Sequence, residues 1–422
     1  MEPFTRVAHN IRLASRKILG QDRHGDSGMR FLFSNVFCIL TIANTVCTSG
    51  AFASTTLTVN TELGTSKALY LCGSGDGLSW DPAQGLVGKE TSTGSGVWKF
   101  NLADGTASGS IDAKVVIADR TSPGTHPIWM SGQNFTLNLN QANTLGSVSF
   151  QFPAGSIQLQ TITARGLTPT KQIRIYTPAT PPTATNKAPV IYALDGQNLF
   201  NGGSLTLGTW NLNTTVDEYV GRGIMQAVVI VGIDAADDRI NEYTYVGDPT
   251  RPGEPGGGGD HFAKETIPDV VNWIEKSSGL QIQKTTASRT ILGSSLGGLE
   301  ATYIGLTTSL TTGGIAFGKI LSLSASYWWK NEDLPTRLPE LIKSGSLPAI
   351  FMSMGTLEGD NADDQAQALH GSRSMDTALK AAGYQTGKTY QYVEIPNATH
   401  DEGSWTIRMQ TLFPQVFPPV TH

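Results

Sequence analysis

One short segment, Ile291–Glu300 (ILGSSLGGLE), constrains the fold of this 422-residue chain more than any other. The apolar run Arg289–Leu292 leads into a G-x-S-x-G pattern, and helix-forming residues follow it. This pattern is typical of a sharp turn from a strand to a helix, in which glycines give room and the serine is exposed above a sheet. The pattern alone is weak in a glycine-rich chain. With a strand before it and a helix after it, it predicts Ser295 as a nucleophile.

A serine hydroxyl becomes a strong nucleophile only beside a general base that a third group orients. On a turn of this kind the acid and then the histidine follow the serine along the chain, which leaves His370, His400 and His422. His422 is the last residue and is expected to fray. The apolar spacing around His370 predicts a helix with that histidine on its surface. His400 lies in a polar loop between a strand-like run and a helix, so it is the predicted base.

The acid is expected on the loop after the preceding strand. Ala349–Met354 has the pattern of a buried strand, and GTLEGDNADD follows it. Glu358 is the first carboxylate on that loop and is the favoured acid, while Asp360 stays open as the alternative. Asp363 and Asp364 are expected to cap the next helix, where negative charge suits the N-terminal dipole.

The negative charge that develops on the substrate oxygen requires two backbone N–H donors. Leu296, directly after the serine, is expected to supply one. The second is expected from Gln197, because Pro189–Leu194 resembles a strand and Gly196 lets the loop after it approach closely. The alternative for Asp195–Asn198 is a simple turn between elements.

Seven motifs occur in order along the chain: LDGQNLF, VGIDAADDRINEY, GGGGDHF, GSSLGG, SASYWW, GTLEGD and NATHDEGSW. Together they resemble the family of α/β-hydrolase esterases that includes esterase D, the enterochelin and other siderophore esterases, the feruloyl esterases and the mycolyltransferases. The resemblance covers roughly residues 158–416. It implies a nucleophile, an acid, a base and two oxyanion donors at Ser295, Glu358, His400, Leu296 and Gln197.

The same resemblance marks further candidates for substrate contact. Asp195 and Arg239 are two of them. For Arg239, which matches an R-x-x-E segment with Glu242, a structural ion pair that braces the loop beneath the site is the alternative. Trp328 and Trp329 are expected either to wall the acyl or alcohol pocket or to lie in the core. His261 precedes the serine and is expected to be structural.

Apolar runs alternate with helical stretches across residues 156–422, which predicts an α/β-hydrolase fold with a mostly parallel central sheet. The expected strands are Val190–Leu194, Ala227–Ile233, Arg289–Leu292, Lys319–Leu323, Ala349–Met354 and Tyr390–Ile395.

Residues 1–53 are expected to be an N-terminal extension and a signal peptide. Met29-Arg30 precedes the apolar stretch Phe31–Val46, and Ala51-Phe52-Ala53 fits an A-x-A cleavage site after Ala53. A membrane anchor is the alternative, but the apolar run is short for a transmembrane helix. The chain is therefore predicted to be secreted or periplasmic, with no stable membrane insertion after cleavage.

Residues 54–155 change character and become rich in Thr, Ser, Gly and Asn, with short strand-like runs. This predicts an all-β, immunoglobulin-like sandwich domain. Its tryptophan-bearing segments are similar to those of starch-binding-type carbohydrate-binding modules. Trp80 and Trp129 are candidates for stacking on sugar rings of a polysaccharide, whereas Trp98 is expected to pack inside. If the domain binds no sugar, it is expected to roof the active site.

Charge and composition exclude other classes. Of the 30 basic and 35 acidic residues, removing residues 1–53 takes away six and three, which leaves 24 and 32 and a formal charge of −8. Nucleic acid is therefore not an expected partner. Cys72 is the one cysteine left, so no internal disulfide can form, and no Cys or His cluster has the spacing of a zinc site. No metal and no cofactor are predicted.

The leading hypothesis is a serine carboxylesterase that works through an acyl-enzyme, and acyl transfer to an alcohol is the alternative with the same residues. A carbohydrate-binding protein built on an inactive hydrolase is the alternative from another class. Acylated polysaccharide, feruloyl ester, siderophore trilactone and small synthetic ester all remain open as substrates.

Overall fold

The structure, a computed structural model, describes residues 38–44, 55–75, 77–102, 109–139, 144–201, 208–307, 315–342 and 347–420. Its contacts divide the chain into two compact units. The first, called the α/β unit, holds the described residues of 155–215 and 227–412. The second, called the β unit, holds those of 38–154, 216–226 and 413–420. The domain boundaries expected from the sequence, after residues 53 and 155, stay predictions.

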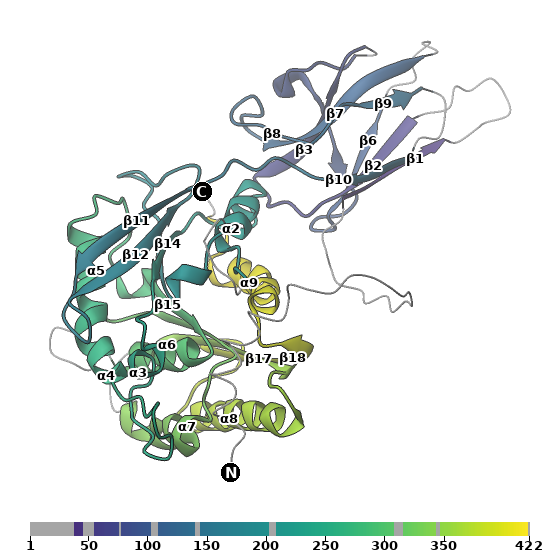
Figure 1. The fold of residues 1–422 in the computed structure, drawn as a ribbon. Helices are drawn as coiled ribbons and strands as arrows, with labels where there is room; N and C mark the ends of the chain where they lie inside the picture. Colours follow the sequence, from purple (N-terminus) through teal and green to yellow (C-terminus); the bar gives the residue numbers. More distant parts are fainter. Residues whose placement is uncertain are drawn as a thin grey trace, which may run out of the picture. The chain divides into compact units, whose positions relative to one another are not determined.

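The α/β unit is built on a sheet in the strand order β11-β12-β14-β13-β15-β16-β17-β18 (Figure 1). The strands are β11 (Ser156–Thr163), β12 (Thr170–Thr177), β13 (Val190–Leu194), β14 (Val229–Ile233), β15 (Arg289–Ser294), β16 (Lys319–Leu323), β17 (Ala349–Leu357) and β18 (Tyr390–Thr399). Only β11–β12 and β12–β14 pair antiparallel, and the other pairs are parallel. The predicted, mostly parallel sheet is therefore confirmed.

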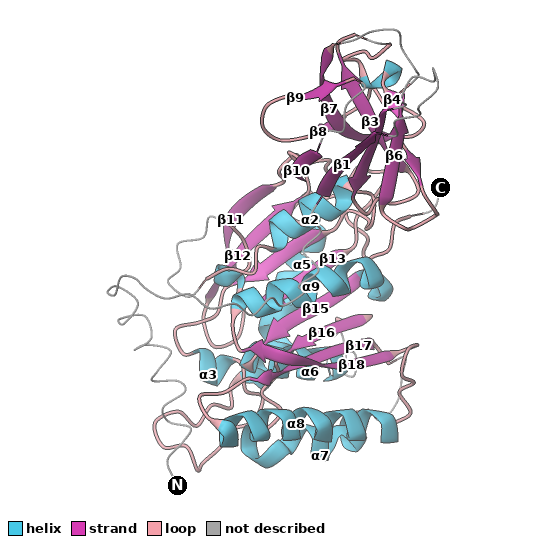
Figure 2. Cartoon of the chain, turned by 90° about the vertical axis from the view of Figure 1, so that its right-hand side faces the viewer, coloured by secondary structure: helices cyan, strands magenta, loops and turns pink. Residues whose placement is uncertain are grey.

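Helices cover this sheet, and Figure 2 shows them in cyan beside the magenta strands. They are α2 (Leu212–Gly221), α3 (Arg239–Glu242), α4 (Gly259–His261), α5 (Ile267–Lys276), α6 (Leu296–Thr307), α7 (Trp329–Leu341), α8 (Ala362–Ala381) and α9 (Glu402–Val416), with short turns at Gly196–Asn198 and Thr286–Ser288 and a wider turn at Phe262–Thr266. Every residue of β13 and β14 is buried. Their sequences, VIYAL and VIVGI, lack the polar alternation of a strand with one wet face, because both faces are covered.

Three strands of this sheet end in the same strained way. The residues directly after β13, β15 and β16 are Asp195, Ser295 and Ser324, with φ of 57°, 56° and 50°. A non-glycine residue rarely adopts positive φ, and such residues gather at functional sites. In parallel α/β sheets ligands bind beside the carboxyl ends of the strands. The backbone itself therefore points to this edge of the sheet.

The β unit consists of two antiparallel sheets with one shared core. Its strands are β1 (Cys38–Asn44), β2 (Thr55–Asn60), β3 (Lys67–Gly73), β4 (Leu86–Val87), β5 (Lys89–Glu90), β6 (Val97–Asn101), β7 (Ser110–Asp119), β8 (Ile128–Trp129), β9 (Phe135–Asn138) and β10 (Thr144–Val148), with a turn at Pro82–Gln84. Trp98 is 1% exposed, as expected. Cys72 is buried, and burial together with the nearby Asp81 raises the pKa of its thiol to about 11. An immunoglobulin-like arrangement stays a prediction.

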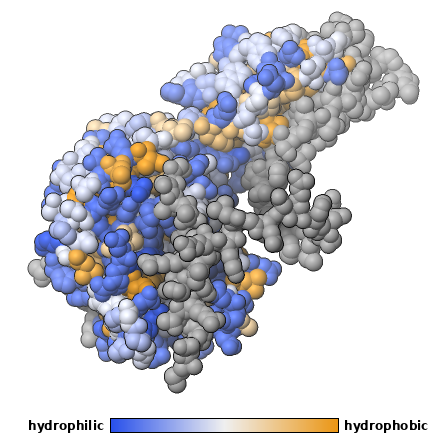
Figure 3. All heavy atoms as spheres, viewed as in Figure 1, coloured by the Kyte–Doolittle hydropathy of each residue, from blue (hydrophilic) through white to orange (hydrophobic). Residues whose placement is uncertain are grey.

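The predicted leader is only partly described. Cys38–Asn44, inside its apolar stretch, forms β1 and pairs antiparallel with β2 and β10. The rest of the leader and the predicted cleavage site after Ala53 lie outside the described residues. Within the described ranges, no helix is both long enough and apolar enough to cross a membrane. On the face seen in Figure 3, hydrophilic residues predominate over the α/β unit and hydrophobic ones form small groups.

Candidate active site

Ser295 stands between β15 and α6, as the sequence predicts. Its backbone N–H donates to the Leu323 carbonyl (3.1 Å), and its carbonyl accepts from the Ser326 N–H (3.1 Å). A Cβ on Gly293 would lie 2.1 Å from the Gly297 carbonyl oxygen, a distance that no side chain tolerates. Glycine is therefore required on this turn, and the half-buried serine is held by its own main chain.

Leu296 and Gln197, the two expected oxyanion donors, each lie at the start of a helical turn, before its first intrahelical hydrogen bond. Leu296 is the first residue of α6, and the first N–H groups of a helix have no intrahelical acceptor. Gln197 is the second residue of the turn Gly196–Asn198, whose first bond runs from Asn198 N–H to the Asp195 carbonyl (2.9 Å). A Cβ on Gly196 would meet the Gly232 backbone at 2.6 Å, so this loop packs directly on β14.

The structure places Glu358, rather than Asp360, against His400. The Nδ1 atom of His400 lies 2.9 Å from Glu358 Oε2. Glu358 is 3% exposed, whereas Asp360 is exposed. Among the described residues the structure records no hydrogen bond between Ser295 and His400. Such bonds are often long in enzymes without substrate and shorten when it binds.

The other carboxylate oxygen of Glu358 accepts three hydrogen bonds. Its donors are the Ser324 hydroxyl (2.6 Å), the Gly355 N–H (2.5 Å) and the Arg408 guanidinium (2.8 Å). Burial tends to raise the pKa of Glu358, but His400, Arg408 and the Ser324 hydroxyl together hold this pKa below its ordinary value. Glu358 is thus an ionised carboxylate with one oxygen reserved for His400.

The sequence reasoning missed Ser324 and Arg408. A weak signal for Arg408 exists, because it shares a helix face with the buried Trp405, Met409 and Leu412. A charged residue on such a face is buried only with a partner. The sequence does not say which carboxylate that partner is.

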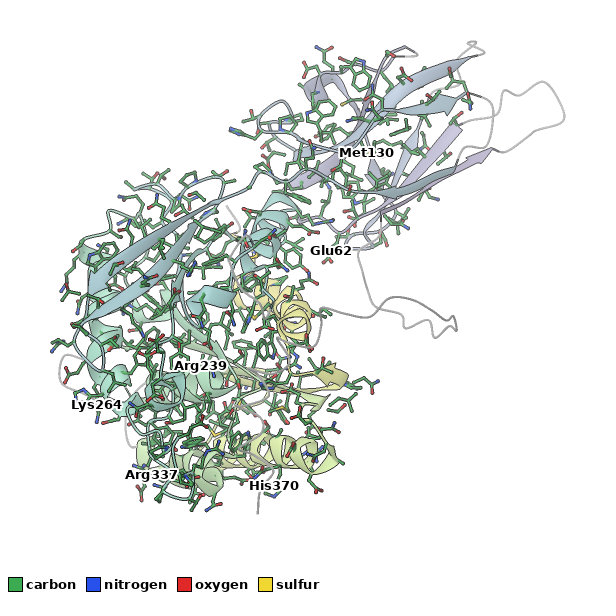
Figure 4. The ribbon with its side chains drawn as sticks, in the orientation of Figure 1. Glu62, Met130, Arg239, Lys264, Arg337 and His370 are labelled. Carbon is green, nitrogen blue, oxygen red and sulfur yellow. The ribbon has the colours of Figure 1, made fainter. Side chains whose placement is uncertain are left out.

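Arg239 and Glu242 each form an ion pair, as the structural alternative expected, but they do not pair with each other. Arg239, the first residue of α3 and labelled in Figure 4, forms two hydrogen bonds to Asp195 (2.7 and 2.8 Å). Glu242 instead pairs with the buried Lys171 and accepts from the Ala236 N–H (2.8 Å). Asp195 directly precedes the turn Gly196–Asn198, so Arg239 braces this loop. Its side chain remains 31% exposed at the strand ends.

A family model described as "Putative esterase" matches residues 167–415. The chain belongs to this esterase family. The resemblance read from the motifs is thereby confirmed, and the chain is a carboxylic ester hydrolase. The β unit lies outside the matched residues, and its similarity to carbohydrate-binding modules stays a prediction.

Relatives of this esterase are distant. An uncharacterized protein, YbbA of Bacillus subtilis (strain 168), is 26% identical over 218 residues, which are 51% of this chain and 80% of that protein. A feruloyl esterase module from Clostridium thermocellum, complexed with sinapinate, is 18% identical with a TM-score of 0.47, over 64% of this chain and 90% of its own. The enterobactin esterase FES from Shigella flexneri is 14% identical with a TM-score of 0.46, and the match covers 90% of this chain and 97% of that one.

The two tryptophans after β16 in this esterase differ in exposure. Trp329 is 1% exposed and donates its indole N–H to the Val246 carbonyl (2.8 Å), so of its two expected positions it takes the one in the core and not the pocket wall. Trp328 is half-buried and borders a surface hollow of about 490 Å³. His370, which Figure 4 labels, lies on α8 as predicted, borders this hollow and pairs with Glu332. Trp328 therefore stays a candidate for substrate contact.

The esterase family chain also buries a carboxyl that its proposed chemistry does not use. Glu300 lies on α6 with 0% exposure, and neither of its side-chain oxygens has a hydrogen-bond partner among the described residues. Burial, with smaller effects of Glu242 and Asp260, raises its pKa well above the ordinary value.

Within the described ranges, no group of three or more His, Cys, Asp or Glu residues could hold a metal ion.

We expect Glu300→Gln to stabilise the esterase at alkaline pH. Because the folded pKa is raised, the native state keeps a proton that the unfolded state loses above about pH 4.3. Stability then falls by about 1.4 kcal/mol per pH unit between the unfolded and the folded pKa. Urea unfolding at pH 4 and pH 8 should show a gain for Glu300→Gln that grows with pH. The exposed Glu340→Gln on α7 is the control, and an equal gain in that variant would contradict the assignment.

Proposed function

We propose that this chain is an exported serine carboxylesterase that works through a Ser295–His400–Glu358 triad. The observation that carries the proposal is the hydrogen bond from His400 to Glu358 at the strand ends that also present Ser295. Membership of the esterase family supports the ester as the reacting group. Export by residues 1–53 is part of the proposal and rests on the leader sequence alone.

The reaction follows from the positions of these groups. Ser295 Oγ attacks the ester carbonyl carbon while His400 takes the hydroxyl proton, and Glu358 stabilises the resulting imidazolium. The N–H groups of Leu296 and Gln197 stabilise the negative oxygen. His400 then protonates the departing alkoxide as the C–O bond breaks, which leaves an acyl-Ser295. Water, deprotonated by His400, attacks this acyl-enzyme and releases the acid and the free serine.

The molecule that attacks the acyl-enzyme, water or an alcohol, decides between hydrolysis and acyl transfer. Replacing that water by an alcohol gives an acyltransferase with the same residues. For the natural substrate we propose a carbohydrate-linked or siderophore ester, the classes implied by the motifs of the family. Arg239 is proposed as a substrate contact through the part of its side chain that remains exposed.

Hydrolysis of p-nitrophenyl acetate and butyrate tests the proposal, together with covalent labelling by a fluorophosphonate. We expect turnover by the parent protein and a label on the peptide that contains Ser295. Ser295→Ala should lose both signals. A folded parent that neither hydrolyses these esters nor takes the label would overturn the catalytic proposal.

A second function, glycan binding by the β unit, is favoured by one observation. The rings of Trp80 and Trp129 lie 6.4 Å apart at their centroids, and Trp80 is 39% exposed. Adjacent indole faces form a platform on which sugar rings can stack.

We expect Trp129→Ala to weaken binding to soluble glycans about tenfold, which corresponds to about 1.4 kcal/mol of lost stacking. Affinity electrophoresis through gels that contain soluble polysaccharides gives the measurement. Val87→Ala, at an exposed residue of the same unit, serves as the control. Unchanged retention of Trp129→Ala would remove this residue from the binding surface.

A further inference from the structure

Ser324 stands at the centre of a buried group of hydrogen bonds behind Glu358. Its Oγ donates to Glu358 Oε1 (2.6 Å) and accepts from the Trp405 indole N–H (2.8 Å) and from Arg408 Nη1 (2.6 Å). The second terminal nitrogen of Arg408 donates to Glu358 Oε1 (2.8 Å). The arginine therefore reaches the acid twice, directly and through the serine.

Helix α9 also contacts the base, His400. His400 lies two residues before α9, and Trp405 and Arg408 lie on it. The Trp405 ring meets the His400 ring edge to face, with centroids 5.2 Å apart. Arg408 also bonds the Ser404 hydroxyl (3.1 Å) next to this tryptophan. Helix α9 is thus connected to the acid by Arg408 and to the base by Trp405.

Stability alone is a poor explanation for Arg408. Its side chain is 2% exposed, and its Nε is buried without a hydrogen-bond partner among the described residues. Removing a guanidinium from water is costly, and buried ion pairs are often no more stable than apolar side chains of similar volume. What Arg408 does supply is direction, because its Nη2, the Ser324 hydroxyl that its Nη1 binds and the Gly355 N–H all donate to Oε1 and leave Oε2 for His400.

We propose that Arg408 is a positioning residue, which acts through Ser324 and Glu358 to fix the orientation of the His400 ring. This inference rests on the proposed triad. Without Arg408 the Glu358 carboxylate loses two of its constraints and can rotate, so the His400 ring spends less time aimed at Ser295. The titratable and charged side chains that act on the Glu358 carboxyl are those of His400 and Arg408.

Three variants of the full chain test this role. Arg408→Met removes the charge and the donors, Arg408→Lys restores the charge, and Ser324→Ala removes only the bridging hydroxyl. The control is Arg289→Met, which breaks another ion pair, the partly buried one with Glu275, at the opposite end of β15. Each variant is measured for kcat, KM and the pH profile with p-nitrophenyl butyrate, and for urea unfolding. The downfield proton NMR signal of the His400 ring N–H that faces Glu358 is recorded without substrate.

We expect Arg408→Met to lower kcat about 10- to 100-fold, the range for losing a hydrogen bond that orients an active-site group, with KM almost unchanged. The acidic limb of its pH profile should move to higher pH, because Glu358 then keeps its proton to a higher pH. Arg408→Lys should reverse that movement and restore part of kcat. Ser324→Ala should also lower kcat, and it should cost less stability than Arg408→Met because the ion pair between Arg408 and Glu358 stays in place, which keeps the test valid if Arg408→Met unfolds.

The His400 N–H signal should weaken in Arg408→Met and persist in Arg289→Met. Unchanged kcat, pH profile and N–H signal in folded Arg408→Met or Ser324→Ala would overturn the positioning role. Equal losses of kcat in Arg289→Met would do the same. An inactive parent that fluorophosphonate does not label would instead defeat the proposed function, and the NMR signal would still decide whether Arg408 orients His400.

Discussion

His400→Ala should lower kcat/KM for p-nitrophenyl butyrate by about 10⁴- to 10⁶-fold, and adding Ser295→Ala should lower it little further. Residues that act as one unit show this non-additivity, because the loss of either already removes the nucleophilic pathway. The activity that remains is expected from the N–H donors of Leu296 and Gln197 and from substrate binding, which both variants keep.

The measurement compares the parent, the two single variants and the double variant at one pH. His370→Ala is the matched control, because His370 is an exposed histidine on α8 with its own acidic partner, Glu332. It should hydrolyse the ester like the parent. If the losses of the two single variants instead multiply in the double variant, Ser295 and His400 do not work as a unit and the triad assignment is wrong.

Lys171→Met should lower the free energy of unfolding by about 3–5 kcal/mol, the range for breaking a buried ion pair from one side. The side chains of Lys171 and Glu242 are 3% and 2% exposed. The substitution leaves the Glu242 carboxylate in the core with the Ala236 N–H as its remaining donor (2.8 Å). It also removes the cation that lies 5.3 Å from the centroid of the Phe262 ring.

Equilibrium unfolding in urea measures this loss from the midpoint and the slope of the transition. Adding Glu242→Gln to Lys171→Met should recover part of it, since the unpaired charge is then gone. Lys264→Met is the control, because Lys264 (Figure 4) pairs with Asp260 on the surface, where such pairs contribute about 0–1 kcal/mol. A loss in Lys171→Met no larger than in the control would contradict the assigned role.

The sequence predicted what has a local signature. Apolar runs predicted β13 to β17, because strands covered on both faces lose the alternation of polar residues. The elbow around Ser295 was visible because its glycines, strand and helix are contiguous. Glu358 could be predicted because it comes directly after a strand, although only the structure distinguishes it from Asp360.

Long-range polar pairs were not predictable in this way. Arg408 and Ser324 are 84 residues apart, and Lys171 and Glu242 are 71 apart. No period or motif connects such positions, because their pairing is decided by which strand ends and helices the fold brings together. Arg239 is another example. The carboxylate of its own motif, Glu242, is three residues away, but its partner in the structure is Asp195, 44 residues away.

At Asp195, Ser295 and Ser324 the positive φ angles place backbone stability and function in conflict. Glycine would relax each backbone by on the order of 1 kcal/mol, yet it would remove the Arg239 partner, the nucleophile or the hydroxyl behind Glu358. A mutant library selected for heat resistance alone should therefore drift toward glycine at these three positions. The same library selected for ester turnover should keep the strained residues, so thermostability is best engineered elsewhere in the chain.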